Sequence, residues 1–99
     1  MRNFRKVEKI SFWIPETVGD DIEGAVMAVG GIVTTVNGEM EFISIKTVEG
    51  TKAIGVSAGL RNLLEQVEVG NYIRVVFKGE EINKKTGRRF KAFELFIAE

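Results

Sequence analysis

The chain has 99 residues, of which 44% are hydrophobic and 28% charged, the composition of a single globular domain. It contains no cysteine and no histidine, so disulfides, thiolate zinc sites, cysteine nucleophiles and histidine general bases are excluded. The net charge is zero, but residues 1–50 carry five basic and eight acidic side chains, whereas residues 51–99 carry nine and six. A polyanion responds to such a local excess of positive charge and not to the sum.

The N-terminal residues predict an arm, residues 1–17, in front of the folded domain. Met1–Lys6 is charged and leads into no long apolar run, so neither a signal peptide nor a membrane anchor is expected. The missing cysteines are compatible with a reducing cytoplasm. Within the arm we expect Phe12, Trp13 and Ile14 to pack onto the domain, because together they would expose an aggregation-prone patch. A base-stacking platform and a partner-binding arm are the alternatives for Trp13, and a homodimer contact through the arm is compatible with packing.

A long first strand is predicted from Asp21 to Val36, which is rich in valine, isoleucine and threonine. Three glycines inside it predict a bend or bulge: Gly24, Gly30 and Gly31. Asn37-Gly38 predicts a hairpin turn in which both residues have positive φ. A second strand is expected over residues 40–46, and a third from Lys52 to Ser57 after a turn at Glu49-Gly50.

The hydrophobic period then changes from that of a strand to that of a helix. Four apolar side chains at helical spacing predict one buried face of a short helix that rests on the sheet: Leu60, Leu63, Leu64 and Val67. Ser57 is expected to cap the start of this helix through its hydroxyl. Gly70 is expected to end the helical region.

Two more strands complete the chain. Residues Tyr72 to Lys78 alternate, and three of them are expected to be buried: Ile73, Val75 and Phe77. A polar, basic loop from Glu80 to Arg89 is expected to join this strand to a last strand from Phe90 to Ala98. The last strand is expected to point three side chains inward: Phe93, Leu95 and Ile97.

The predicted order is β-β-β-α-β-β, in a single domain of residues 1–99. Among five-stranded folds this is the order of the oligonucleotide/oligosaccharide-binding (OB) fold, an all-β, five-stranded Greek-key barrel with one short helix. An SH3-like small barrel is the rival fold, although it usually lacks a helix at this place.

Two parts of the chain resemble a known family. The sequence VGNYIRVVFKG at residues 69–79, followed by KKTGRRFKAFEL at 84–95, is similar to the C-terminal half of small viral OB-fold single-stranded DNA-binding proteins. VGDDIEG at residues 18–24 resembles the same family at the start of its first strand. The resemblance implies roles in DNA replication, repair or recombination, and the host cytoplasm if the protein is viral. Asn71 departs from the aspartate that is usual there, and the acidic N-terminal half favours one localised groove.

The most basic stretch lies between the last two predicted strands. It holds five cations and an aromatic residue within eight positions and no acid: Lys84, Lys85, Arg88, Arg89, Phe90 and Lys91. In an OB-fold this loop borders the ligand groove, where cations contact phosphates and Phe90 stacks on a base. The other interpretation is a solubilising hairpin tip.

The outward faces of two strands supply further candidates. They carry Phe42 and Lys46 on the second strand, and Arg74 and Lys78 on the fourth. Aromatics and cations on one sheet face are what a sequence-tolerant single-strand binder uses. For Phe42, stacking on a base and packing at the end of the barrel are both open. Tyr72 is expected to be structural.

We therefore expect non-catalytic binding of single-stranded DNA with little sequence preference, and no cofactor, metal, membrane or small-molecule substrate. Two alternatives stay open: an RNA-binding OB protein, and a protein-interaction or assembly module, which the zero net charge and the apolar arm favour. A homodimer is compatible with these functions. Asp20, Asp21 and Glu23 are better explained by capping and turns than by a metal site.

Overall fold

The computed structural model describes residues 3–4 and 11–98 of the chain. Five strands and one short helix follow one another in the predicted order, which is confirmed. The elements are β1 (Asp21–Thr35), β2 (Gly38–Thr47), β3 (Gly50–Gly55), α1 (Ala58–Leu64), β4 (Tyr72–Ile82) and β5 (Arg89–Ile97). No helix in the described ranges is long and apolar enough to cross a membrane.

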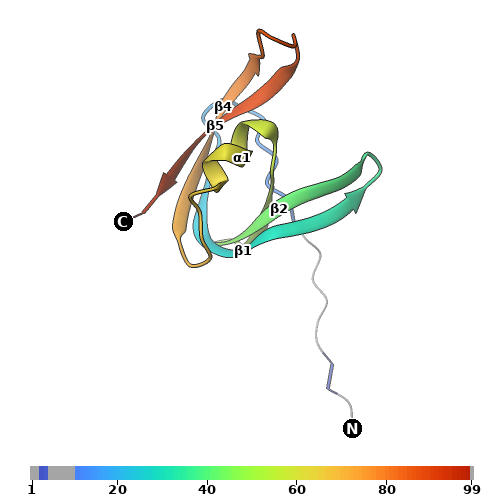
Figure 1. Ribbon diagram of the computed structural model, residues 1–99. Coiled ribbons are helices and arrows are strands. Elements are labelled where there is room, and N and C mark those ends of the chain that lie inside the picture. The colour runs from blue at the N-terminus through green and yellow to red at the C-terminus, as the bar shows by residue number, and fades with distance from the viewer. Residues whose placement is uncertain (1–2, 5–10, 99) are drawn as a thin grey trace.

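The five strands form one antiparallel sheet in the spatial order β3-β2-β1-β4-β5. The first part of β1 pairs with β4, and its longer second part pairs with β2. Because β4 returns to lie beside β1 after the β1-β2-β3 meander, these four strands form a Greek key. Figure 1 shows the hairpins β1–β2 and β4–β5 projecting from the curved body in different directions.

The prediction of a mostly β domain with five strands and one short helix is confirmed, but the described residues form one sheet that does not close between β3 and β5. The edge of β3 pairs instead, in parallel, with the arm. The Trp13 N–H donates to the Ala53 carbonyl at 2.8 Å, and the Ala53 N–H donates to the Ser11 carbonyl at 2.8 Å. The Trp13 ring reaches Phe93 of β5, with ring centroids 6.2 Å apart. The part of the arm from Ser11 to Trp13 therefore lies in the opening between two edge strands.

The core forms where the alternating faces of the strands meet the helix. Its buried side chains include Ile43 and Ile45 of β2 and the three predicted inward residues of β4: Ile73, Val75 and Phe77. The predicted inward residues of β5 are half-buried against this cluster. Leu60 of α1 is completely buried. The helix ends at Leu64, earlier than the spacing predicts, and Val67 is buried from the turn that follows.

The long first strand bends at its glycines, as predicted. The register between β1 and β2 shifts twice between Val26 and Gly31. Gly30, inside this stretch, has a φ of +73°, which favours glycine. Gly24 is buried, and a Cβ there would collide with the Lys46 carbonyl of β2. These glycines therefore serve the bend and the close approach of β2.

The first hairpin turn differs from the prediction. Gly38 has a φ of +110°, but no described non-glycine residue has a positive φ, so Asn37 does not. The turn is formed by Val36 and Asn37, and the Thr35 hydroxyl accepts from the Asn37 N–H and donates to the Gly38 carbonyl. The turn at residues 47–50 repeats these two bonds. Both turns share the sequence Thr-Val-x-Gly, so the threonine hydroxyl orders each turn.

Two further predictions need correction. Ser57 precedes α1, but its hydroxyl makes no capping bond, and the amides of Leu60 and Arg61 bond to its backbone carbonyl. Ser57 Oγ is buried and has no hydrogen-bond partner among the described residues. The basic loop is shorter than predicted, because β4 continues to Ile82 and β5 begins at Arg89.

Candidate functional site

The turn between β4 and β5, together with the first residue of β5, presents four cations that we call the basic tip: Lys84, Lys85, Arg88 and Arg89. Its backbone is ordered from within. The Asn83 N–H donates to the Arg88 carbonyl at 2.8 Å, and the Gly87 N–H donates to the Asn83 carbonyl at 2.7 Å. All four cations are exposed, and within the described ranges only Arg89 has an ion-pair partner, Glu80 at 4.0 Å. The tip therefore offers positive charge on a defined turn.

Phe90 is half-buried at the base of the basic tip. It lines a cavity of about 420 Å³ together with Arg88, Arg89 and Gly59 of α1. A Cβ at Gly59 would lie 3.5 Å from the Phe90 ring and would collide with the Lys91 carbonyl. The close approach of α1 to β5 therefore requires this glycine, and it brings an aromatic ring and two predicted cations around one cavity, the Phe90 cavity.

A larger cavity of about 680 Å³ opens where β3 and β5 do not pair, and we call it the β3–β5 groove. Its mostly apolar lining comes from the arm, the β1–β2 hairpin, β3 and β5, and includes Trp13, Met40, Ile54, Val56, Lys91 and Phe93. Lys91 adds a positive charge to this lining. Because Phe90 and Lys91 are neighbours on β5, the Phe90 cavity and the groove adjoin the same strand.

The predicted aromatic candidates in the arm and on β2 are partly covered. The packing prediction is confirmed for Phe12 and Trp13, which are half-buried, but it is wrong for Ile14, which is 70% exposed. Phe42 is half-buried and meets Phe12 edge-on, with ring centroids 5.8 Å apart. Of the two interpretations of Phe42, the structure therefore fits packing, whereas Trp13 both packs and lines the groove.

Three predicted cations lie away from the basic tip. Arg74 Nε bonds to Asp21 Oδ2 at 2.7 Å, and Lys78 Nζ lies 3.1 Å from Glu94 Oε1. Such half-exposed ion pairs add little stability, but each carboxylate offsets the charge of its cation. Lys46 is exposed at the end of β2, near the β2–β3 turn. Met40, which lines the groove, lies at the opposite end of the same strand.

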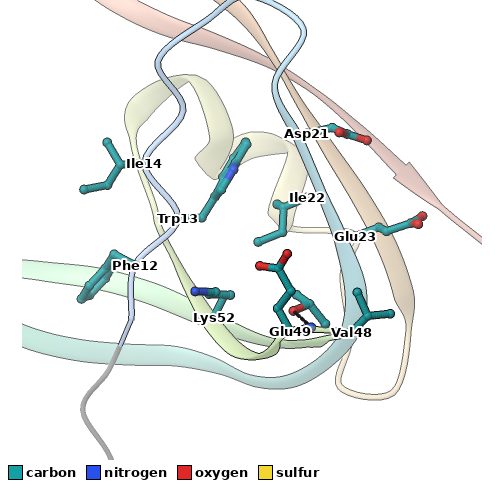
Figure 2. Close-up of a pocket in the computed structure, with 10 residues that line it drawn as sticks. Phe12, Trp13, Ile14, Asp21, Ile22, Glu23, Val48, Glu49 and Lys52 are labelled. Atoms are coloured by element: carbon teal, nitrogen blue, oxygen red, sulfur yellow. Dashed lines mark hydrogen bonds between the residues drawn. The ribbon is translucent and has the colours of Figure 1, made fainter.

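Figure 2 shows another cavity, of about 340 Å³, with Trp13 and Ile22 on its walls. Lys52 also lines it and donates from Nζ to Ser11 Oγ at 3.1 Å. Three acids complete the surroundings: Asp21, Glu23 and Glu49. These carboxylates would repel a polyanion, so the Phe90 cavity and the β3–β5 groove are the better candidates for one.

Asp20 serves a turn, as predicted. Its Oδ2 atom accepts from the backbone N–H groups of Thr17 and Glu16, both at 3.0 Å. These two bonds, chiefly the one from Thr17, favour the charged carboxylate and lower the pKa of Asp20 below its ordinary value of 3.8. The acids that precede and begin β1 are thus used in a turn by Asp20 and in an ion pair by Asp21.

Of the residues that line the β3–β5 groove, only Trp13 and Lys91 were predicted site residues; those that the sequence pattern did not assign to a site include Met40, Ser57 and Phe93. Met40 lies two positions before Phe42 on β2, so the same alternation was an available signal. Phe93 was assigned to the core and Ser57 to a cap. Tyr72, expected to be structural, is 46% exposed on β4.

Comparison with models of protein families, with curated proteins and with solved structures gave no match. The function is therefore inferred from the basic tip, the Phe90 cavity and the β3–β5 groove.

Proposed function

We propose that this protein is an OB-fold domain that binds single-stranded DNA with little sequence preference and without catalysis. The observation that carries the proposal is the position of the basic tip beside the Phe90 cavity, with the β3–β5 groove on the same strand. Cations on the tip suit the phosphates, and the aromatic and apolar surfaces beside them suit the bases.

The topology supports the OB-fold assignment. An OB-fold is a five-stranded, partly open Greek-key barrel that binds its ligand between the loops of its first and last hairpins. The Greek-key order and the single opening between β3 and β5 agree with that description. The groove takes Thr35 and Met40 from the first hairpin and Lys91 from the last, so it lies between the corresponding hairpins.

The residues divide into two roles in this proposal. Lys84, Lys85 and Arg88 neutralise phosphates, and Arg89 joins them when it leaves Glu80. Phe90 stacks on a base from its cavity, which contributes roughly 1–3 kcal/mol. Lys91 contacts a phosphate of the DNA where the DNA strand enters the β3–β5 groove, beside Trp13. Arg74, Lys78 and Lys46 contribute less, because they lie outside this path.

A protein-interaction module is the second candidate, and the apolar lining of the β3–β5 groove favours it. The groove already holds one extended segment of the arm, paired with β3 through Trp13 and Ala53. A peptide strand from a partner would use the same edge.

Binding of RNA differs from the main proposal only in the sugar, so matched DNA and RNA oligomers separate the two.

Trp13 is the single tryptophan of the chain and lies in the groove, so its fluorescence tests the proposal directly. We expect oligo-dT to quench Trp13 emission in a saturable way, with matched oligo-rU measured in parallel. Lys91→Ala should weaken this response, whereas Lys46→Ala, which removes an exposed lysine outside the groove, should weaken it much less. An oligomer that binds without changing Trp13 emission would remove the groove from the site, and no binding would leave the interaction module.

A further inference from the structure

The second part of β1 has an open backbone edge. β1 pairs with β4 only from Asp21 to Ala25, and after Ala25 its ladder is with β2 alone. The Val26 N–H and carbonyl are still satisfied by Asn71 and Gly70. Beyond that point no described residue pairs with the other side of β1. Residues 27–35 are therefore an edge strand, visible along the outside of the β1–β2 hairpin in Figure 1.

The ladder shows which backbone groups face this open edge. The Glu41 carbonyl accepts from the Val56 N–H, at 2.8 Å, on the side of β2 that faces β3. The N–H and carbonyl of one residue in an antiparallel strand point to the same side, so those of Glu41 face β3, and the Ile32–Glu41 pair exchanges no hydrogen bonds across the β1–β2 ladder. The N–H and carbonyl of Ile32 consequently point outward, and those of Thr34, two residues on, do the same.

This edge lacks the charges that normally prevent strands from pairing with other chains. No charged residue occurs from Gly24 to Gly38. Three large apolar side chains of this strand are about half exposed or more: Met27 at 53%, Val29 at 49% and Ile32 at 64%. The other open edges differ. β5 carries exposed Arg89, Lys91 and Glu94, the end of β4 beyond its pairing with β1 carries exposed Lys78, Glu80 and Glu81, and β3 pairs with the arm at Ala53. The β1 edge is thus the unprotected one in the described part of the chain.

We propose that residues 31–35 of β1 pair antiparallel with the same residues of a second copy of this chain, so that the sheet continues across a dimer. A two-fold axis beside Val33 places Ile32 opposite Thr34 of the second copy. Both residues have outward N–H and carbonyl groups, so each such pair exchanges two hydrogen bonds. The pairing is self-complementary, as a two-fold interface requires.

The features of the edge favour a second copy over a different partner strand. The segment offers no charge by which a different chain would be selected, and two identical uncharged strands do not repel each other. The register shifts that end at Gly31 leave residues 31–35 as the regular stretch, and this stretch is centred on Val33. The interface shares only Thr35 with the lining of the β3–β5 groove and no residue with the basic tip. Its argument uses the backbone edge of β1 alone, so this inference does not depend on the proposed function.

The test is the molar mass of the full chain, measured by light scattering over a range of concentrations. We expect about twice 11.0 kDa at high concentration. Ile32→Lys, which puts a cation of each copy beside the axis, should give the mass of one chain. Val48→Lys makes the same change at a fully exposed valine of the β2–β3 turn and should leave the dimer intact. Thr34→Pro removes an outward N–H and should also give single chains.

Circular dichroism identifies any variant that fails to fold, and amide hydrogen exchange of the unmodified chain provides an independent readout. In the dimer the Ile32 and Thr34 amides should exchange slowly, and dilution to the single chain should remove this protection. A chain that keeps the mass of one copy at every concentration overturns the proposal. So does a dimer that folded Ile32→Lys and Thr34→Pro variants retain, and so does rapid exchange of both amides in a dimer.

Discussion

The ring of Phe42 lies directly across Gly31 of the neighbouring strand. These residues are partners in the β1–β2 ladder, and a Cβ on Gly31 would lie only 2.7 Å from Cζ of the ring. Phe12 of the arm meets the same ring edge-on. Gly31 thus allows Phe42 to lie flat on β1 in a position where the arm can pack against it.

Replacing Gly31 by alanine should therefore destabilise the fold by about 1–3 kcal/mol, the usual cost of overpacking. Gly55→Ala is the matched control, because its Cβ would meet only the flexible Met40 side chain, at 3.3 Å from Sδ. Urea unfolding of both variants gives the comparison. Adding Phe42→Leu to Gly31→Ala should recover part of the loss, since it removes the colliding ring atoms. Equal stability of the two glycine variants would show that the ring moves aside freely.

The arm provides a second prediction, because two adjacent residues have opposite environments. Trp13 packs between β3 and β5, whereas Ile14 is 70% exposed. We expect Trp13→Ala to destabilise the protein by about 2 kcal/mol, less than a fully buried aromatic would. Ile14→Ala should change stability by no more than about 0.5 kcal/mol. If the two variants unfold at the same urea concentration, packing of Trp13 between β3 and β5 does not contribute to the stability of the folded protein.

Replacing Ser57 by alanine tests whether its hydroxyl caps α1 or is buried without a hydrogen-bond partner. A capping serine loses about 1 kcal/mol on replacement by alanine. Ser57 Oγ makes no hydrogen bond within the described chain and is buried, so removing it should leave stability unchanged or raise it slightly. Thermal unfolding of Ser57→Ala measures the difference. A loss near 1 kcal/mol would mean that the hydroxyl caps α1 in solution.

Asp20 should make stability depend on pH in the acid range. Its pKa is lowered in the folded protein by the N–H bonds from Thr17 and Glu16. Between the folded pKa and the ordinary value of 3.8 the unfolded chain binds more protons, so stability rises with pH. The contribution is complete above 3.8 and is lost as the pH falls through the folded pKa.

The measurement is urea unfolding of the unmodified chain and of Asp20→Asn, compared from about pH 2 to pH 6. The variant keeps an acceptor oxygen but cannot ionise, so the stability difference between the two proteins should grow as the pH rises and then level off. A difference that stays constant over this range would contradict the ionic role of Asp20 in the turn.

The order of elements and most of the core were predictable because they depend on local periodicity. Ile73, Val75 and Phe77 alternate cleanly, and all three are buried. The bend of β1 was predictable because glycines inside a strand mark bends and bulges, and the positive φ of Gly30 favours glycine. These features need no knowledge of which strand lies beside which.

Features that depend on distant partners were not predictable. The arm pairs with β3 across forty residues of sequence, and a short segment such as Ser11–Trp13 carries no period that reveals this. The partners of Arg74 and Lys78 lie on neighbouring strands, so their charge looked available in the sequence. The turn at Asn37 was misassigned because the hydroxyl of Thr35, two residues earlier, orders it.

The most direct measurement is a fluorescence-anisotropy titration of labelled oligo-dT at several salt concentrations. The proposal predicts saturable binding that weakens with salt, with duplex DNA competing poorly. Replacing Lys84, Lys85 and Arg88 by alanine should lower the slope of log affinity against log salt by about 2, since each lost phosphate contact removes roughly 0.7 for a single strand. Arg74→Ala, whose cation is paired with Asp21, should lower it much less. No binding even at low salt, or a triple variant with an unchanged slope, would contradict the proposed function.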